Sequence, residues 1–244
     1  MTLAGFLLLF TLSFDHNFAD WDALLKRYVT VTENGKVTRV DYTALKKKEA
    51  ELDRVLVTLS RVSQQEFNKW TRNQQQAFLI NAYNAFTWKR ILLDWPVNSI
   101  KDAGGWRGPW KTAFFTLLDE ERHLDWIEHE QLRPVYNDPR IHFAVNCASK
   151  GCPPLRGEAY RASDLDRQLE EQTRLFLSNT AENEVNVKLK TLRLSKIFDW
   201  FEDDFTQNNQ SVGKWVSQYL PEMAKSSFKW KVTYTDYDWS LNGK

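Results

Sequence analysis

The chain has 244 residues, of which 42% are hydrophobic and 27% are charged, as is usual for a globular protein and not for a disordered or fibrous one. Its formal net charge of +1 excludes the basic excess of a nucleic-acid-binding protein, so we expect no nucleic-acid partner. Two cysteines are too few for a disulfide scaffold, whereas 11 Trp, 15 Phe and 8 Tyr predict a large aromatic core.

The first 14 residues are mostly apolar and resemble the core of a secretory signal peptide, with a candidate cleavage point after Ala19. The run is shorter than the roughly 20 residues that span a membrane, and a buried N-terminal helix is the alternative. We assign residues 1–19 to a signal peptide or anchor and residues 20–244 to a single globular domain. We therefore expect a periplasmic or secreted protein that meets a membrane only through an uncleaved leader.

Helices dominate the first half of the chain. Apolar residues at helical spacing predict helices over residues 20–30, 44–60, 67–93 and 124–133, and alternation predicts a short strand over 36–40. The helix over 67–93 is the longest because Pro96 is the first breaker after its start, and its apolar centre predicts a core helix. Asp125 is the predicted cap of the helix over 124–133, and Pro134 is expected to end it.

The second half mixes strands with shorter helices. The pattern predicts a strand over 141–146, a helix over 163–178, a hairpin or bulged strand over 185–194, short helices over 195–205 and 212–220, and a last strand over 228–234. This order indicates an α+β single domain, with the helix-rich first half packed on a small, mostly antiparallel sheet. A papain-like or transglutaminase-like arrangement is one form that such a domain can take.

Two asparagines stand in the apolar centre of the longest predicted helix. Asn81 and Asn84 share a helix face because they are three residues apart, and Tyr83 lies between them in the sequence. Buried amides must be hydrogen-bonded, so these side chains either brace a neighbouring loop or orient catalytic groups. In a later loop, Trp106 and Trp110 stand among glycines, where they either close over a pocket or cover the edge of the core.

The stretch 138–156 holds both cysteines, Cys147 and Cys152, and one of the four histidines, His142. Cys147 follows the predicted strand over 141–146 and enters a loop. At such a position, backbone N–H groups can stabilise a thiolate. The sequence therefore predicts Cys147 as a nucleophile.

A catalytic thiol needs a base within hydrogen-bonding reach. In an extended strand, His142 would lie about 16 Å from Cys147 and on the opposite face. His129 belongs to a separate element, where Glu128 or Asn81 could fix its tautomer. We therefore pair Cys147 with His129; the alternatives are a surface histidine at position 129 and a buried histidine bonded to backbone at position 142.

The cysteines allow three other interpretations. In an oxidising compartment Cys147 and Cys152 could form a small-loop disulfide. They could bind zinc with His129 and His142, although the spacing matches no common zinc pattern. Cys152, next to Pro153, could also be a packed structural thiol. Phosphate-binding loops and nucleophile-elbow motifs are absent from the sequence, and we expect neither a cofactor nor a metal.

Several motifs together resemble one known family. They are AFLINAYNA at 77–85, IEH at 127–129, DPRIHFAVNCAS at 138–149 with CPPL at 152–155, FDWF at 198–201 with DF at 204–205, and YDWSLN at 237–242. In this order they resemble the family called domain of unknown function 547, over roughly residues 40–242. The chain departs from the family where its helix segment begins Ala-Phe-Leu, since relatives often carry a Trp there, and this alters packing rather than chemistry.

The resemblance implies a soluble or exported domain, and its Asn, Glu-His and Cys motifs suggest a thiol hydrolase or transferase. Here the histidine precedes the cysteine, which is opposite to the order in papain-like enzymes.

We accordingly predict a cysteine-dependent hydrolase or acyl transferase that acts on an amide or thioester of a small molecule or peptide. Cys147 is the expected nucleophile and His129 the base, with Glu128 or Asn81 orienting the histidine and N–H groups around Ala148 and Ser149 holding an oxyanion. The residues expected to contact the substrate are Tyr83, Asn84, Arg140, His142, Ser149 and Trp106. The alternative is a non-catalytic exported binding domain with an aromatic cleft and a Cys147–Cys152 disulfide. The sequence does not define an oligomeric state.

Overall fold

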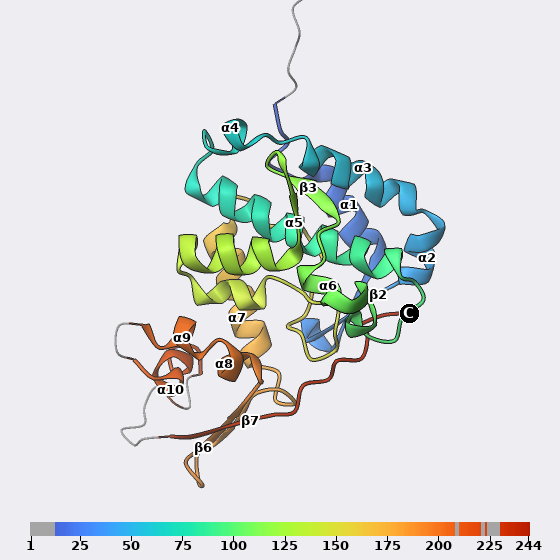
Figure 1. Ribbon diagram of the computed structural model, residues 1–244. Coiled ribbons are helices and arrows are strands. Elements are labelled where there is room, and N and C mark those ends of the chain that lie inside the picture. Colours follow the sequence, from blue (N-terminus) through green and yellow to red (C-terminus); the bar gives the residue numbers. More distant parts are fainter. Residues whose placement is uncertain (1–12, 208–209, 221–222, 224–229) are drawn as a thin grey trace, which may run out of the picture.

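One long helix, α5 (Arg72–Leu93), runs through the centre of the structure (Figure 1). A computed structural model describes residues 13–207, 210–220, 223 and 230–244 of the chain. Every residue of α5 from 76 to 88 is buried, which confirms the predicted core helix. The helix begins later than predicted because Thr71 and Gln74 form a capping box, and Phe67 instead ends the separate short helix α4 (Gln64–Phe67).

Further helices surround α5. The α-helices are α1 (Ala19–Tyr28), α2 (Tyr42–Lys47), α3 (Glu49–Ser60), α6 (Gly108–Lys111), α7 (Leu165–Leu177), α8 (Ile197–Trp200), α9 (Glu202–Phe205) and α10 (Val212–Val216). The 3₁₀ helices are η1 (Glu33–Gly35), η2 (Ile100–Asp102), η3 (Gly105–Arg107) and η5 (Pro139–Phe143), and η4 (Trp126–Tyr136) is a π-helix. The helix predicted over 44–60 is thus divided at Lys48, and the one over 195–205 is divided at Phe201.

The strands form three small sheets in the described part of the chain. They are β1 (Val29–Thr32) with β2 (Val37–Val40), β3 (Phe115–Leu117) with β4 (Glu120–Arg122), and β5 (Glu184–Asn186), β6 (Thr191–Leu194) and β7 (Lys231–Tyr234). All pairs are antiparallel except β6 and β7, which are parallel. The α+β class and the single domain are confirmed. The expectation of one sheet beneath the helical half is wrong, because the strands divide into two local two-stranded sheets and one three-stranded sheet.

The strand predicted over 228–234 includes β7. Phe228, its first predicted residue, lies outside the described residues. The hairpin predicted over 185–194 is confirmed as β5 and β6.

The buried apolar side chains form two clusters. The larger one contains the helices of the first half, and the smaller one contains residues of α7 to α10 and β6 (Figure 1). Phe143, at the end of η5, belongs to the second cluster, whereas its neighbour Ala144 belongs to the first. The segment that leads to Cys147 therefore lies where the two clusters meet.

Two predicted elements near this junction are different in the structure. Residues 141–143 are part of the 3₁₀ helix η5, whose first turn is capped by the Asp138 side chain, so the predicted strand over 141–146 is wrong. Pro134 lies inside η4 and does not end it; the wider π-helical turn continues to Tyr136. The helix ends instead where Asn137 adopts a left-handed conformation (φ 55°) and its N–H donates to the Arg133 carbonyl.

The segment before α1 packs against the domain. Phe14 lies 5.1 Å from Trp70 and 5.4 Å from Phe78, measured between ring centroids, and Phe18 is buried. Residues 1–12, which hold most of the predicted leader, lie outside the described residues. None of the helices within the described ranges has the length and apolar character needed to cross a membrane.

Candidate functional site

The loop that carries Cys147 is held by amide side chains. Asn84 on α5 donates from Nδ2 to the Ala144 carbonyl (3.0 Å) and accepts from Asn146 N–H (2.8 Å). Asn146 in turn accepts from Ala148 N–H (2.9 Å) and donates to the Pro153 carbonyl (2.9 Å). Ala148 adopts a left-handed conformation (φ 58°), which is uncommon for a residue with a side chain and turns the loop immediately after the cysteine.

The C-terminal tail completes this loop. It returns from β7 past the cysteine loop toward β2, where the chain ends (Figure 1). Gly151 N–H donates to the Asp238 carbonyl, and Lys150 N–H donates to the Ser240 carbonyl, both at 2.9 Å. These bonds bring Tyr237 to Cys147 although the two residues are 90 positions apart.

Cys147 is partly buried and surrounded by hydrogen-bonding groups. Its Sγ lies 3.0 Å from Ser149 Oγ and 3.1 Å from the Tyr237 hydroxyl, and its N–H donates to Cys152 Sγ (2.9 Å). Both cysteines are free thiols. Burial alone would raise the pKa of Cys147, but hydrogen bonds from Cys152, Ser149 and Tyr237 outweigh burial and lower that pKa to about 7.

The neighbouring groups keep their protons. Burial, together with the Cys147 thiolate, raises the pKa of Cys152 and of Tyr237 well above their ordinary values. Of the two thiols, Cys147 therefore loses its proton first, and the negative charge of the pair lies on Cys147. A thiolate at neutral pH is the nucleophilic form of cysteine.

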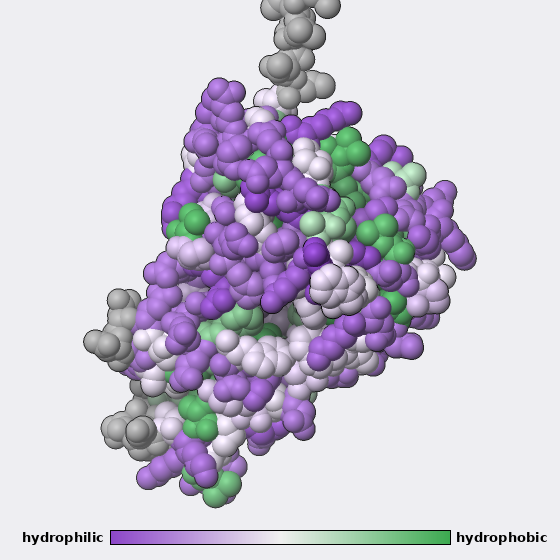
Figure 2. Space-filling model, in the orientation of Figure 1, coloured by the Kyte–Doolittle hydropathy of each residue, from purple (hydrophilic) through white to green (hydrophobic). Residues whose placement is uncertain are grey.

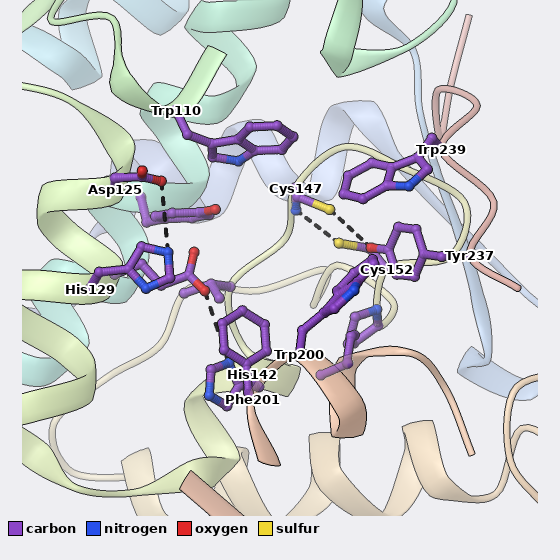
Figure 3. Close-up of a pocket in the computed structure, with 15 residues that line it drawn as sticks. Trp110, Asp125, His129, His142, Cys147, Cys152, Trp200, Phe201, Tyr237 and Trp239 are labelled. Atoms are coloured by element: carbon purple, nitrogen blue, oxygen red, sulfur yellow. Dashed lines mark hydrogen bonds and ion pairs between the residues drawn. The ribbon is translucent and has the colours of Figure 1, made fainter. Parts of the chain in front are cut away.

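Cys147 opens into a pocket of about 240 Å³. The molecular surface is hollowed between α6 and α8 (Figure 2), and the side chains around the pocket are shown in Figure 3. Its aromatic lining comes from α6, the junction of α8 and α9, and the C-terminal tail: Trp110, Trp200, Phe201, Tyr237 and Trp239. The pocket also contains Tyr83, whose pKa is raised well above 10 by burial and by the nearby Glu128 and cysteines.

The helix η4 forms the opposite wall of the pocket (Figure 3). Asp125, which immediately precedes η4, is followed at intervals of four by His129 and Arg133 of the helix. His129 Nε2 lies 3.8 Å from Asp125 Oδ1, and Arg133 donates from Nη1 to His129 Nδ1 (2.9 Å). Because guanidinium only donates, His129 Nδ1 must accept, and the ring proton of this histidine lies on Nε2.

His142 forms a second histidine site beneath Phe201. Its Nε2 donates to Asp204 Oδ2 (2.6 Å), and its Nδ1 faces Glu128 Oε1 at 4.0 Å. Phe201 stacks on the imidazole with ring centroids 4.0 Å apart. Arg133 binds both oxygens of Asp204 (2.7 and 3.1 Å). Burial tends to raise the pKa of Asp204, but the bonds from His142 and Arg133 lower it to about 2.

The predicted Cys147–His129 hydrogen bond is not formed. His129 lines the same pocket from the facing wall, and its Nδ1 is bonded to Arg133. In an extended strand His142 would lie far from Cys147, but residues 139–143 form the 3₁₀ helix η5, and His142 lines the pocket together with Cys147. Glu128 is adjacent to a histidine as expected, but that histidine is His142.

Other predicted site residues have structural contacts. Asn81 bonds the backbone of Tyr160 through both amide atoms (2.8 and 3.0 Å) and so does not orient His129. Arg140 pairs with Asp138 and lies outside the pocket lining, and Trp106 is 89% exposed. Asn84 braces the cysteine loop, which matches the first of its two interpretations.

The expected oxyanion site around Ala148 and Ser149 is altered as well. Ala148 N–H already donates to Asn146 Oδ1, and Ser149 N–H is directed to Cys147 Sγ. The sulfur is therefore surrounded by the Ser149 N–H and by the hydroxyls of Ser149 and Tyr237.

Four residues at the site were not predicted from the sequence: Tyr237, Asp204, Arg133 and Trp239. Tyr237, Asp204 and Trp239 belong to motifs that carried the family resemblance, which was the signal that could have found them. Their distance along the chain from Cys147 concealed their position. Within the described residues, no group of three or more His, Cys, Asp or Glu side chains is arranged to hold a metal ion.

Fold and site together define an α+β domain with a partly ionised cysteine in an aromatic pocket. Residues 67–177 match the model of the family described as "Protein of unknown function, DUF547", the same family that the sequence motifs resemble. The matched region includes α5, η4, η5, the cysteine loop and α7, whereas Asp204 and Tyr237 lie beyond it. Searches of curated proteins and of solved structures found no match.

Proposed function

We propose that the protein is a cysteine-dependent hydrolase or acyl transferase acting on an amide or thioester of a small molecule or peptide. The observation that carries this proposal is the environment of Cys147, where Ser149, Tyr237 and Cys152 lower the thiol pKa to about 7 inside a pocket. A structural cysteine buried without such donors would have a raised pKa. Perturbed thiols in pockets are common at active sites.

The histidines take different roles in this proposal. Local donors already stabilise the Cys147 thiolate, so neither histidine is needed to deprotonate the thiol. His142 is oriented through Nε2 by Asp204, which leaves Nδ1 directed toward Glu128 and the pocket. This is the order of contacts in an Asp–His pair that accepts a proton. His129 carries its proton on Nε2 and supplies a hydrogen-bond donor on the facing wall.

The reaction proceeds by acyl transfer through the sulfur. The Cys147 thiolate attacks the carbonyl carbon, the bond to the nitrogen or sulfur leaving group breaks, and that group takes up a proton from solvent. Water or another nucleophile then loses a proton to His142 and attacks the thioester. The bond between the carbonyl carbon and the sulfur breaks, the acyl product leaves, the thiolate is restored, and His142 returns its proton to solvent. The hydroxyls of Ser149 and Tyr237, released from the acylated sulfur, can then donate to the carbonyl oxygen.

A papain-like or transglutaminase-like logic describes these steps, although His142 precedes Cys147 in the chain. The predicted leader would place the activity in the periplasm or outside the cell. The second candidate function is a binding domain, which the six aromatic side chains of the pocket favour. That function would use the pocket without acylation of Cys147.

Acyl-enzyme formation tests the proposal. The protein is incubated with a small aryl thioester, and trypsin then separates the cysteines, because cleavage after Arg140, Lys150 and Arg156 places Cys147 in peptide 141–150 and Cys152 in peptide 151–156. We expect the acyl group on peptide 141–150 and release of the aryl thiol beyond one equivalent. Cys147→Ser should abolish both signals. Release at the rate of a simple thiol, or an intact Cys147–Cys152 disulfide, would contradict the proposal.

A further inference from the structure

The pocket beside Cys147 has an excess of negative charge. Asp125 and Glu128 line it with side chains that are only 19% and 9% exposed. Their ion-pair partners in the described part of the chain are histidines, at 3.8 Å for Asp125 and 4.0 Å for Glu128. Neither Lys nor Arg occurs among the residues that line the pocket. Two largely buried carboxylates thus face the pocket without a permanent cation beside them.

The nearest guanidinium behind this wall is already neutralised. Arg133 binds both carboxylate oxygens of Asp204 at 2.7 and 3.1 Å, and its remaining bond goes to His129. Asp204 therefore balances Arg133. Because His129 accepts from Arg133, this histidine does not contribute a second positive charge in this geometry. Asp125 and Glu128 thus have no ion pair with a Lys or Arg within the described residues.

The other walls are suited to a cation as well. Trp110, Trp200, Phe201, Tyr237 and Trp239 offer aromatic rings, whose faces attract ammonium and guanidinium groups. Two of these rings already lie next to cations of the chain, since Lys101 Nζ is 3.7 Å from the ring centroid of Trp239 and the Arg133 guanidinium carbon is 4.9 Å from that of Phe201. Carboxylates combined with aromatic rings form the environment in which proteins bind organic cations.

We infer that the pocket recognises a substrate carrying an ammonium or guanidinium group, bound by Asp125, Glu128 and the aromatic rings while its carbonyl faces Cys147. This inference rests on the proposed function, because it takes Cys147 as the reacting group. Asp125, at the start of η4, and the Cys147 thiol lie on different sides of the pocket (Figure 3), and Glu128 on η4 also lines it. The cation and the scissile carbonyl are accordingly separate parts of one molecule.

Charged alkylating reagents test this inference without a known substrate. Three iodoacetamides are used, with 2-(trimethylammonio)ethyl, 3,3-dimethylbutyl or 2-sulfonatoethyl on the amide nitrogen, so that shape is similar and charge differs. For each reagent, the rate at which Cys147 is alkylated is measured on tryptic peptide 141–150. This rate is divided by the rate at which the same reagent alkylates N-acetylcysteine at the same pH. The cationic reagent should be favoured over the neutral one by about tenfold, and the anionic reagent should be the slowest.

Substitutions assign the effect to the two carboxylates. Asp125→Asn and Glu128→Gln should each reduce the preference for the cationic reagent at least threefold, whereas Glu130→Gln, at an exposed position of the same helix, should leave it unchanged. Division by the rate of the neutral reagent removes any change in thiol reactivity or folding. Equal normalised rates for all three reagents, or a preference that survives both substitutions, would overturn the inference. The rate with the neutral reagent tests a different point. If that rate is low while the cationic reagent is still favoured, the result would contradict the role of Cys147 as a nucleophile and not the preference for a cation.

Discussion

At the scale of single residues, the reactivity of Cys147 depends on donors from distant parts of the chain. Tyr237→Phe removes one hydrogen bond to the sulfur and should raise the pKa of Cys147 by about one unit, because a bond to a charged group contributes about 1.5 kcal/mol. Alkylation of peptide 141–150 as a function of pH measures this. Tyr219→Phe, at a partly buried tyrosine outside the pocket, is the matched control. An unchanged profile in Tyr237→Phe would refute the assigned role of the hydroxyl.

The two histidines are distinguished by their effect on the acylated protein. His142→Gln keeps a donor toward Asp204 but loses the base, so hydrolysis of the acyl-enzyme should slow by about 100-fold and the acylated form should accumulate. His129→Gln should leave the pKa of Cys147 unchanged, because His129 does not contact the sulfur. Intact-mass measurements over time follow the acylated fraction, with His123→Gln as control outside the pocket. Equal accumulation in all three variants would remove His142 from the mechanism.

At the scale of elements, the contact between the cysteine loop and the C-terminal tail should be sensitive to volume. A Cβ on Gly151 would lie 3.0 Å from Asp238 N and 3.1 Å from the ring of Tyr237. Gly151→Ala should therefore displace the tail, weaken the Tyr237 bond and raise the pKa of Cys147 as Tyr237→Phe does. Gly157→Ala is the control, since its Cβ would meet only Val31 at an ordinary 3.6 Å. Matching pH profiles for Gly151→Ala and the unsubstituted protein would contradict this account.

The Arg133–Asp204–His142 bonds connect η4, α9 and η5 and should stabilise the fold above acidic pH. The folded-state pKa of Asp204 lies at about 2, below its ordinary 3.8, so its contribution is fully present above pH 4 and is lost as pH falls toward 2. At pH 7 the shift corresponds to about 2 kcal/mol. Urea unfolding of Asp204→Asn should show a loss of this size at pH 7 that shrinks below pH 4. Asp203→Asn, exposed on the same helix, should show none. A difference independent of pH would exclude the linkage.

The elements also show what the sequence could predict and why it stopped there. The core helix α5 and the helix α7 were predictable because their apolar periodicity is continuous. The run Ile141 to Asn146 is short and mostly apolar, as in a buried strand, yet the Asp138 cap and the packing of Phe143 in the second cluster accompany a 3₁₀ helix. Cys147 was found from its local sequence. Its partner Tyr237 depends on tertiary contacts that no local pattern encodes.

At the scale of the whole molecule, the two apolar clusters meet at the pocket, and residues before α1 contribute to the larger one. A protein that begins at residue 13 should be more stable to urea than one that begins at residue 20, by about 3 kcal/mol, because the shorter form lacks the buried ring of Phe18 and the packed ring of Phe14. Phe18→Ala in the longer form should account for most of the difference. Equal stability of the two forms would show that residues 13–19 do not contribute to folding.

The most direct test of the central claim is the pH dependence of Cys147 alkylation by iodoacetamide, read on tryptic peptide 141–150. We expect a midpoint at about pH 7 for Cys147 in the unsubstituted protein, and we expect Cys152 in peptide 151–156 to react only at much higher pH. A Cys147 midpoint at the ordinary thiol value of about 8.5, or a disulfide that leaves neither cysteine to alkylate under non-reducing conditions, would contradict it.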